Sequence, residues 1–319
     1  MNLPLTRNNT HALKVVRLRF EVECLEKLNL PEFSGSMFRG VFGNQLRKLS
    51  CMTRQRECTA CPLKSTCPYS LIFETPSADH QRSKQFHNPP RPYVMEEAAS
   101  SRLDLGKGDH FSFGMVLFGY AISQIPLIIL AWEQALVSGL RRSQTPCQLR
   151  AVYAEGEPNP VYLPGQTIQN MPSTQFVHSD FDWINLKRIT LQFVTPLRLL
   201  KQGKRIPLDD ITAELLLMAL ARRYQLLTDT HQPGCLTVDF GLIKQEATKL
   251  AIETDMKWRD QQRYSRRQDR LIPIGGFVGT LTLTGNLAPF GELLEAGQWI
   301  HVGKEATFGL GRYTLRNAE

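Results

Sequence analysis

Residues 16–23 read VRLRFEVE, and this stretch decides the fold class. The apolar residues Val16, Leu18, Phe20 and Val22 alternate with charged ones, and a period of two indicates a strand with one buried face. Far along the chain, the stretch ITLQF at residues 189–193 alternates in the same way. Each of these strands opens a series of helices and strands, so the sequence predicts an α+β protein made of two similar parts.

The predicted elements of the first part are a helix, a strand, a second helix and an extended segment, at residues 36–49, 111–117, 123–138 and 148–153, with Ser36 as the first N-cap. In the second part, Thr195-Pro196 is expected to end the strand at residues 189–193. A helix capped by Asp209 or Asp210, a strand and a short helix are expected next, at residues 210–227, 277–283 and 289–296. This order predicts two tandem ferredoxin-like modules, residues 1–185 and 186–319.

The composition limits the class of protein. The 319 residues are 42% hydrophobic, which is enough to bury cores and excludes a wholly disordered chain. The formal net charge of +8 favours a polyanionic partner, with nucleic acid as the first choice. The N-terminus lacks the apolar core of a signal peptide, and the most apolar run, residues 125–132, is far shorter than the ~20 residues of a membrane span. We therefore expect a soluble cytoplasmic protein with no membrane partner.

Four of the seven cysteines form a cluster, Cys51-x6-Cys58-x2-Cys61-x5-Cys67. In a reducing compartment such a cluster favours a metal over disulfides, and four thiolates close the tetrahedral shell of a structural zinc ion. We therefore expect a cysteine-rich, zinc-binding insertion at about residues 50–108 of the first module. An iron–sulfur cluster, which also takes four cysteines, and a set of unliganded thiols are the alternatives.

The segment KWRDQQRYSRRQDR, residues 257–270, holds six basic residues against two acidic ones, with Trp258 and Tyr264 among them. Arginine forks pair with phosphates, and an aromatic face stacks on an unpaired base. We favour RNA contact over the alternative, a solvated and salt-bridged loop. The candidate RNA-binding residues of this segment are Arg259, Arg263, Arg266, Gln268 and Arg270.

The segment HVGKEATFGLGRY, residues 301–313, places three glycines among basic side chains. Glycines at 303, 309 and 311 would let backbone N–H groups approach a phosphate, with a plain turn between strands as an equally weighted alternative. The segment is neither a Walker loop nor a dinucleotide-binding fingerprint, because no Lys-Ser/Thr ends it and no βαβ unit follows it. No cluster of Asp and Glu resembles a two-metal nuclease, so any phosphodiester chemistry is expected to be metal-independent.

These stretches, in this order, resemble the sixth family of CRISPR-associated proteins, repeat-RNA endoribonucleases of the RAMP superfamily, in a branch with a four-cysteine insertion. The likeness begins near residue 14 and is carried by SMFRGVFGNQLRKLSC (36–51), CTACPLKSTCPYSLIFE (58–74), GDHFSFGMVLFGYA (108–121), FVTPLRLLKQGK (193–204), ARRYQLL (221–227), RYSRRQ (263–268), GGFVGTLTLTG (275–285) and HVGKEATFGLGRY (301–313). The last three are the most specific. One departure is that His301 stands where the family's glycine-rich loop has its first glycine.

The resemblance implies two ferredoxin-like modules that bind CRISPR repeat RNA and cleave it to a 2′,3′-cyclic phosphate and a 5′-hydroxyl. It also implies further CRISPR effector or adaptation subunits as partners. The family's catalytic residues vary in place, so the candidates come from the residues themselves. His301 is the expected base or acid, Lys304 and Arg267 stabilise charge, and Tyr264 is a second proton donor. The RNA-binding set is completed by Arg39, Gly303, Gly309, Gly311 and Arg312.

Two other functions compete with this one. A non-cleaving subunit of the same superfamily would hold a guide RNA with the same fold and charge, and His301 in its basic setting is the main feature that favours the enzyme. A zinc-knuckle DNA-binding or scaffold protein would need the cysteine insertion to make the recognition contacts.

Overall fold

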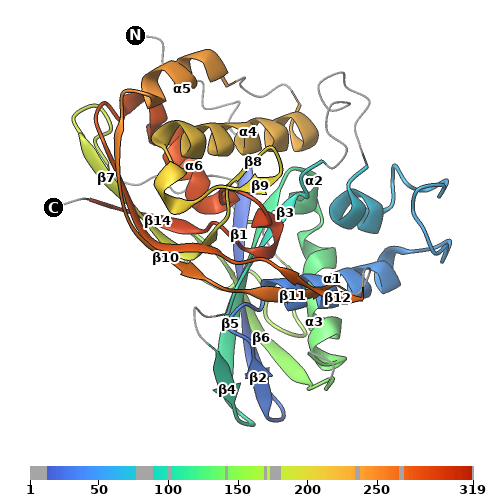
Figure 1. The fold of residues 1–319 in the computed structure, drawn as a ribbon. Coiled ribbons are helices and arrows are strands. Elements are labelled where there is room, and N and C mark those ends of the chain that lie inside the picture. The colour runs from blue at the N-terminus through green and yellow to red at the C-terminus, as the bar shows by residue number, and fades with distance from the viewer. Residues whose placement is uncertain are drawn as a thin grey trace. The chain divides into compact units, whose positions relative to one another are not determined.

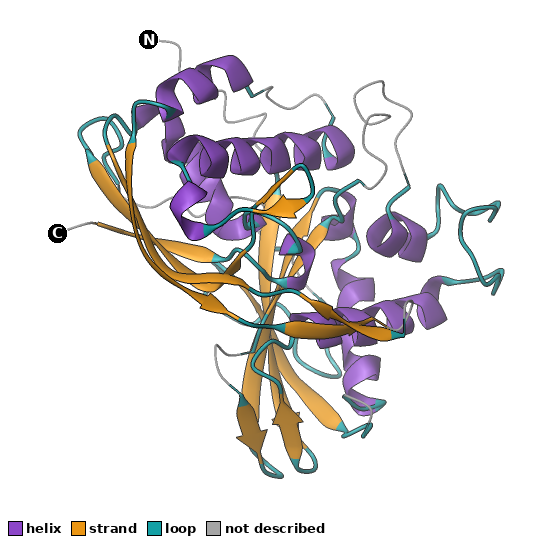
Figure 2. Ribbon diagram, viewed as in Figure 1, coloured by secondary structure: helices purple, strands orange, loops and turns teal. Residues whose placement is uncertain are grey.

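A computed structural model describes residues 13–76, 89–98, 102–140, 143–168, 171–172, 181–233, 238–265 and 269–317. The chain divides into two compact units (Figure 1). The N-terminal unit spans residues 13–177 together with residues 230–232, and the C-terminal unit includes residues 178–229 and 233–319. Each unit holds a four-stranded antiparallel sheet with helices on one face, which confirms the α+β class (Figure 2).

The N-terminal unit has the order β-α-β-β-α-β. Its main elements are β1 (Val15–Cys24), α1 (Gly35–Ser50), β3 (Tyr93–Glu96), β5 (His110–Phe118), α3 (Ile125–Val137) and β6 (Cys147–Ala154). The sheet order is β3-β5-β1-β6, so the first strand lies beside the last and the two middle strands lie on its other side. This is the ferredoxin-like arrangement. Smaller elements are β2 (Leu28–Leu30), η1 (Ser70–Glu74), β4 (Leu103–Leu105) and α2 (Tyr120–Ser123).

The core of this unit follows from the alternation in β1. Phe20 of β1 stacks on Phe113 of β5 with ring centroids 4.9 Å apart, and Trp132 of α3 lies 4.5 Å from Phe113. Phe38 of α1 joins the same group at 4.4 Å from Phe113. These aromatic rings bury large apolar surfaces and fix both helices against one face of the sheet.

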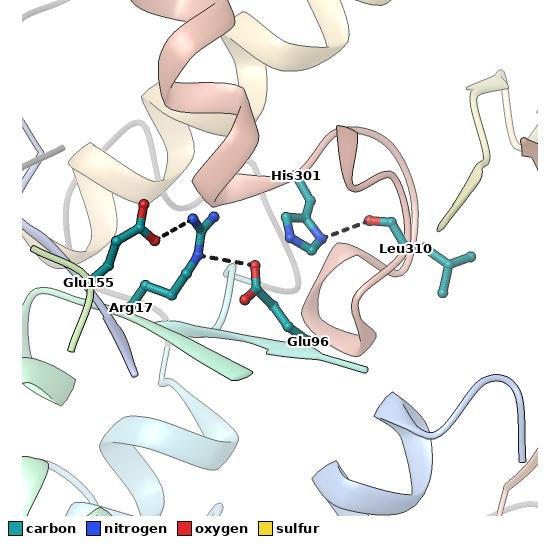
Figure 3. Close-up of polar contacts among 5 residues, drawn as sticks. All are labelled: Arg17, Glu96, Glu155, His301 and Leu310. Carbon is teal, nitrogen blue, oxygen red and sulfur yellow. Dashed lines mark hydrogen bonds and ion pairs between the residues drawn. The ribbon is translucent and has the colours of Figure 1, made fainter. Parts of the chain in front are cut away.

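The sheet of the N-terminal unit also holds an ion-paired group (Figure 3). The Nε of Arg17 lies 3.2 Å from an oxygen of Glu96, whose side chain is 4% exposed. The Nη1 of Arg17 donates to Glu155 at 2.6 Å. One guanidinium therefore compensates a buried carboxylate and a half-exposed one, because its fork presents donors in two directions.

The C-terminal unit repeats the order β-α-β-β-α-β. Its main elements are β7 (Arg188–Leu197), α4 (Ala213–His231), β10 (Ala251–Arg259), β13 (Gly276–Thr284), α6 (Gly291–Ile300) and β14 (Tyr313–Asn317). The sheet order β10-β13-β7-β14 is again ferredoxin-like. Smaller elements are β8 (Leu200–Lys201), β9 (Lys204–Arg205), η3 (Leu208–Asp210), α5 (Phe240–Ala247), β11 (Gln262–Ser265), β12 (Arg270–Pro273), η4 (Ala288–Phe290) and η5 (Ala306–Phe308).

In the N-terminal unit, one strand and the start of one helix differ from the sequence prediction. Residues 93–96, which the sequence placed in the insertion, form β3 and pair with β5 at the edge of the main sheet. All four residues of β3 are buried, so the strand has no alternation to reveal it. Helix α1 begins at Gly35, and Ser34 occupies the N-cap position with no capping bond from its side chain. The Ser34 hydroxyl accepts instead from the backbone N–H of Ala98 at 3.3 Å.

Two of the C-terminal details also differ. Strand β7 continues past Pro196 to Leu197, beside a register shift in its pairing with β13. Such an irregularity tolerates a residue without an N–H donor. Helix α4 begins at Ala213 and its first turn is capped by Thr212, whose hydroxyl accepts from the N–H of Leu215 at 3.2 Å.

None of the described helices is both long and apolar enough to cross a membrane.

Candidate nucleic-acid interface

The glycine-rich segment connects α6 to β14 in the C-terminal unit, and His301 is its first residue. The backbone N–H of His301 donates to the carbonyl of Gly297 at 2.9 Å, which ends the helix. His301 has φ 59° and ψ 168°. Any residue with a Cβ is strained in this region of φ and ψ, which is essentially restricted to glycine. This explains why a glycine suits the position, and an imidazole held there in spite of the strain is a candidate for function.

The ring of His301 is fully buried, and its Nδ1 lies 3.3 Å from the carbonyl oxygen of Leu310 (Figure 3). A carbonyl oxygen only accepts, so Nδ1 carries the proton in this hydrogen bond. In the neutral ring, Nε2 is then the basic nitrogen. The turn between residues 301 and 310 therefore selects one tautomer of the imidazole.

The three glycines shape the turn. Gly303, Gly309 and Gly311 have φ values of 93°, 96° and 69°. A Cβ on Gly311 would lie 1.8 Å from the carbonyl oxygen of Val302, so only glycine fits there. The N–H groups of Gly309 and Gly311 donate to the carbonyls of Ala306 and Pro196, at 2.9 and 3.0 Å. These two amides are therefore used inside the unit and are not offered to a phosphate.

Strand β7 anchors the same turn. The hydroxyl of Thr195 donates to the carbonyl of Gly309 at 2.7 Å and accepts from the N–H of Arg312 at 2.8 Å. The N–H of Lys304 donates to the carbonyl of Arg198 at 2.8 Å. The side chain of Lys304 is exposed and that of Arg312 is half-buried. The anchoring places two cations of the segment beside the end of β7.

The predicted basic segment forms the end of β10 and the β11–β12 hairpin, where Arg263 pairs with Ile272. The guanidinium of Arg263 lies 4.6 Å from the ring centroid of Phe308. A second contact is made by Arg198, whose Nη1 donates to the carbonyl of Pro273 at 2.6 Å. Two segments that the sequence singled out separately thus pack against each other. Arg270, in the second strand of the hairpin, is exposed.

Sequence reasoning missed the contribution of β9. The guanidinium of Arg205 lies 4.3 Å above the ring of Trp258, and the indole Nε1 of Trp258 donates to Asp260 at 2.7 Å. The neighbouring Arg259 is half-buried and pairs in register with Gly276. Trp258 is therefore engaged by protein side chains. The signal that could have found Arg205 is the run of basic residues around a glycine, KQGKR at residues 201–205.

Arg223 is a second missed residue. It lies on α4, and its Nε donates to the carbonyl of Ile300 at 2.5 Å, next to His301 in the chain. Burial lowers the pKa of its guanidinium to about 10, so the group remains charged at neutral pH. A cation at the carboxyl end of α6 is favourable for the helix dipole. The motif ARRYQLL contains this residue, but helix periodicity alone did not assign it to the loop.

The remaining predicted residues divide into two groups. Arg266, Arg267 and Gln268 lie outside the described residues, and for Tyr264 only the backbone is described, in register with Leu271. Arg39 belongs to α1 of the N-terminal unit, where its guanidinium lies 4.2 Å from the ring of Phe73. Arg39 is thus part of the other unit and not of the loop.

The four clustered cysteines all line one pocket at the end of α1. All four are free thiols. Among the described residues, no group of three or more His, Cys, Asp or Glu side chains is arranged to hold a metal ion as it stands. The zinc prediction therefore remains a prediction.

Comparison with known families gives two adjacent matches. A family model described as an N-terminal domain, AF_1859_N, matches residues 13–175. The model of the CRISPR-associated endoribonuclease Cas6 matches residues 191–313, which include the basic hairpin and the whole glycine-rich segment. No curated protein sequence matches the chain.

Several solved structures share the fold. The product complex of a Cas6 from Thermus thermophilus is 15% identical with a TM-score of 0.56, and the match covers 95% of this chain and 99% of that one. A chain of a partial Cas6-RT-Cas1–Cas2 complex is 15% identical with a TM-score of 0.58, over 100% of this chain and 47% of that one. A RAMP protein that binds different RNA substrates is 10% identical with a TM-score of 0.51, over 94% and 99%.

At these sequence identities the solved structures establish only the fold of this chain. The family models establish which protein families its parts are related to. The N-terminal part belongs to the AF_1859_N family. Because the AF_1859_N model covers half of the chain, the chain belongs to that family, and its residues 191–313 match the model of the CRISPR-associated endoribonuclease Cas6.

Proposed function

We propose that this protein cleaves CRISPR precursor RNA within its repeats, in the cytoplasm, and that His301 is a catalytic residue. The observation that carries the catalytic assignment is the backbone of His301, an imidazole held at φ 59° and ψ 168° where glycine is the unstrained residue. Strain of this kind persists where the surrounding structure imposes it, and it is concentrated at functional sites. The family match supports the reaction class.

The proposed reaction is a transesterification that uses the RNA's own 2′-hydroxyl. Nε2 of His301 takes the 2′-hydroxyl proton, the O2′–P bond forms, and the P–O5′ bond breaks. The products are a 2′,3′-cyclic phosphate and a 5′-hydroxyl, whose oxygen receives its proton from Tyr264 or from water. Lys304 and Arg223 stabilise the charge of the pentacoordinate phosphorus, together with Arg267. Because the nucleophile belongs to the substrate, we propose that the reaction needs no metal ion.

The burial of His301 sets a condition on this mechanism. Its ring has no exposed surface, so RNA reaches Nε2 only if neighbouring side chains move when the substrate binds. Catalytic hydrogen bonds commonly tighten only in the substrate complex. The same burial favours a second candidate function, a non-cleaving subunit that holds guide RNA and uses His301 only to fix the turn.

The test is a single-turnover cleavage assay with cognate repeat RNA in EDTA. We expect cleavage by the wild-type protein and none of an RNA with a 2′-deoxy nucleotide at the scissile position. His301→Ala should slow cleavage by about 10²–10⁴-fold while RNA binding persists. His301→Gly is the matched variant, because it removes the imidazole and also the backbone strain.

Wild-type cleavage rates in both His301 variants would remove this residue from the mechanism. Tight binding with intact RNA in every sample would favour the non-cleaving function. Proposed partners beyond repeat RNA are other CRISPR subunits, including adaptation proteins, because a chain of similar fold occurs in a Cas6-RT-Cas1–Cas2 complex.

A further inference from the structure

The segment between α1 and η1 carries four cysteines that the proposed function does not use. Cys51 directly follows α1, and its N–H continues the helical bonding by donating to the carbonyl of Arg47 at 2.9 Å. Cys67 lies shortly before η1 and its carbonyl accepts from the N–H of Leu71 at 3.0 Å. Figure 1 draws this segment, coloured blue, as a loop that extends beyond the end of α1.

The backbone between these two cysteines forms successive turns. The N–H of Cys61 donates to the carbonyl of Cys58 at 3.2 Å, and the N–H of Lys64 donates to the carbonyl of Cys61 at 3.1 Å. The N–H of Cys67 then donates to the carbonyl of Leu63 at 2.8 Å. A Cys-x2-Cys turn is a common way to supply two thiolates to one tetrahedral ion.

The ends of the segment are fixed to the unit. Cys58 and Cys67 pack against the hydrophobic core. The Nη2 of Arg47 donates to the carbonyl of Arg56 at 2.8 Å, and its guanidinium lies 5.5 Å from the ring of Tyr69. The backbone on both sides of the cysteines is therefore fixed by contacts within the N-terminal unit. An ion bound between the cysteines would cross-link segments of that unit.

The pocket lined by Cys51, Cys58, Cys61 and Cys67 encloses about 10 Å³, which is the space of roughly one water-sized sphere. A hydroxyl is already placed as an outer partner, because Oγ1 of Thr53 lies 3.4 Å from Sγ of Cys61. The same pocket is lined by Lys64, a cation that would offset part of the negative charge of four thiolates. Size, donor type and charge all suit a single soft divalent cation.

We propose that Cys51, Cys58, Cys61 and Cys67 bind one zinc ion as four thiolates. On binding, four Zn–S bonds form and the thiol protons are released to solvent. The side chains do not converge in their present rotamers, so the ion draws the sulfurs together by rotation about their χ1 angles. Its role is structural, because a closed shell of four protein ligands leaves no position for a substrate.

The test uses the full chain and does not involve RNA cleavage, so its result does not depend on whether the protein is a nuclease. The protein is purified with reducing agent and its metal content is measured by mass spectrometry. We expect about one zinc ion per chain. The double variant Cys58→Ser/Cys61→Ser should lose the zinc, whereas Cys235→Ser, which removes a cysteine outside the cluster, should retain it.

A cobalt titration of the metal-free wild-type protein provides a second measurement that needs no variant. Tetrahedral Co²⁺ with four thiolates gives intense visible and near-ultraviolet bands, and added zinc should remove them. Protein without zinc and without these cobalt bands would overturn the proposal. A brown protein that contains iron and sulfide would overturn it as well, in favour of an iron–sulfur cluster.

Discussion

Gly311 illustrates how much a single residue contributes to the glycine-rich turn. Gly311→Ala places a Cβ 1.8 Å from the carbonyl oxygen of Val302, at φ 69°. We expect the free energy of unfolding of the C-terminal unit to fall by about 3 kcal/mol or more, through backbone strain and the clash together. Urea unfolding followed by circular dichroism measures the decrease.

Gly203→Ala is the matched control for this substitution. Gly203 also has a positive φ, 78°, and belongs to the same unit, but a Cβ there would meet nothing within 4 Å. The control should lose only about 1–2 kcal/mol, the cost of strain alone. Equal decreases in the two variants would show that the clash with Val302 does not contribute.

The sequence could single out His301 as a candidate residue, but it could not predict its backbone conformation. Its basic, glycine-rich surroundings are visible in the chain, whereas its φ of 59° depends on α6 ending where Val302 bonds to Gly311. Arg223 could not be found in the same way. Its link to Ile300 joins residues far apart in the chain, and no helix pattern encodes such a contact.

At the scale of elements, the strands with one buried face were predictable and the others were not. Strands β1, β5, β7 and β13 alternate or carry apolar runs, so their positions follow from the sequence. Strand β10 lies at a sheet edge and is mostly exposed, with only Met256 buried. Strand β3 is buried throughout. Neither environment produces a period of two.

The β11–β12 hairpin yields a prediction about RNA affinity. In Arg263→Gln/Arg270→Gln we expect weaker binding of repeat RNA and a weaker salt dependence. The slope of log K against log salt should decrease by about 1.4, or about 0.7 for each phosphate that the variant no longer neutralises. Fluorescence anisotropy over a range of salt concentrations measures both quantities.

The control for the hairpin removes the same number of charges elsewhere in the unit. Lys244 and Lys249 are paired with Glu214 and Glu246, at 3.9 and 2.6 Å. Lys244→Gln/Lys249→Gln should leave the slope unchanged, because these cations already have acidic partners. If the control and the hairpin variant shift the slope equally, net charge rather than the hairpin governs binding.

At the scale of the whole molecule, the two antiparallel sheets have the same ferredoxin-like strand order, and they confirm the expected α+β class. The order of elements was sufficient for this prediction even though no residue-level repeat is visible. The proposed zinc ion and the proposed RNA contacts depend on side-chain geometry and on ligands, which the order of elements does not specify.

The net charge of +8 leads to a prediction for the 319-residue chain as a whole. Between about 50 and 200 mM salt we expect the affinity for repeat RNA to fall about 10²–10³-fold, as for roughly six phosphate contacts to a single strand. The rate constant for cleavage of RNA already bound should change little, because salt screens the long-range attraction between exposed charges much more than contacts between groups that are already bound and buried. Binding measured by anisotropy and single-turnover cleavage at saturating protein separate the two.

The backbone at His301 also has a consequence for how this chain tolerates change. Glycine at this position would remove about 1–3 kcal/mol of backbone strain, but it would also remove a fully buried ring and its hydrogen bond to Leu310. Truncating a buried aromatic side chain costs roughly 3–5 kcal/mol, so the packing of the ring offsets the strain of the backbone. In a screen that selects only for heat resistance, His301→Gly should therefore not be enriched over the wild-type protein.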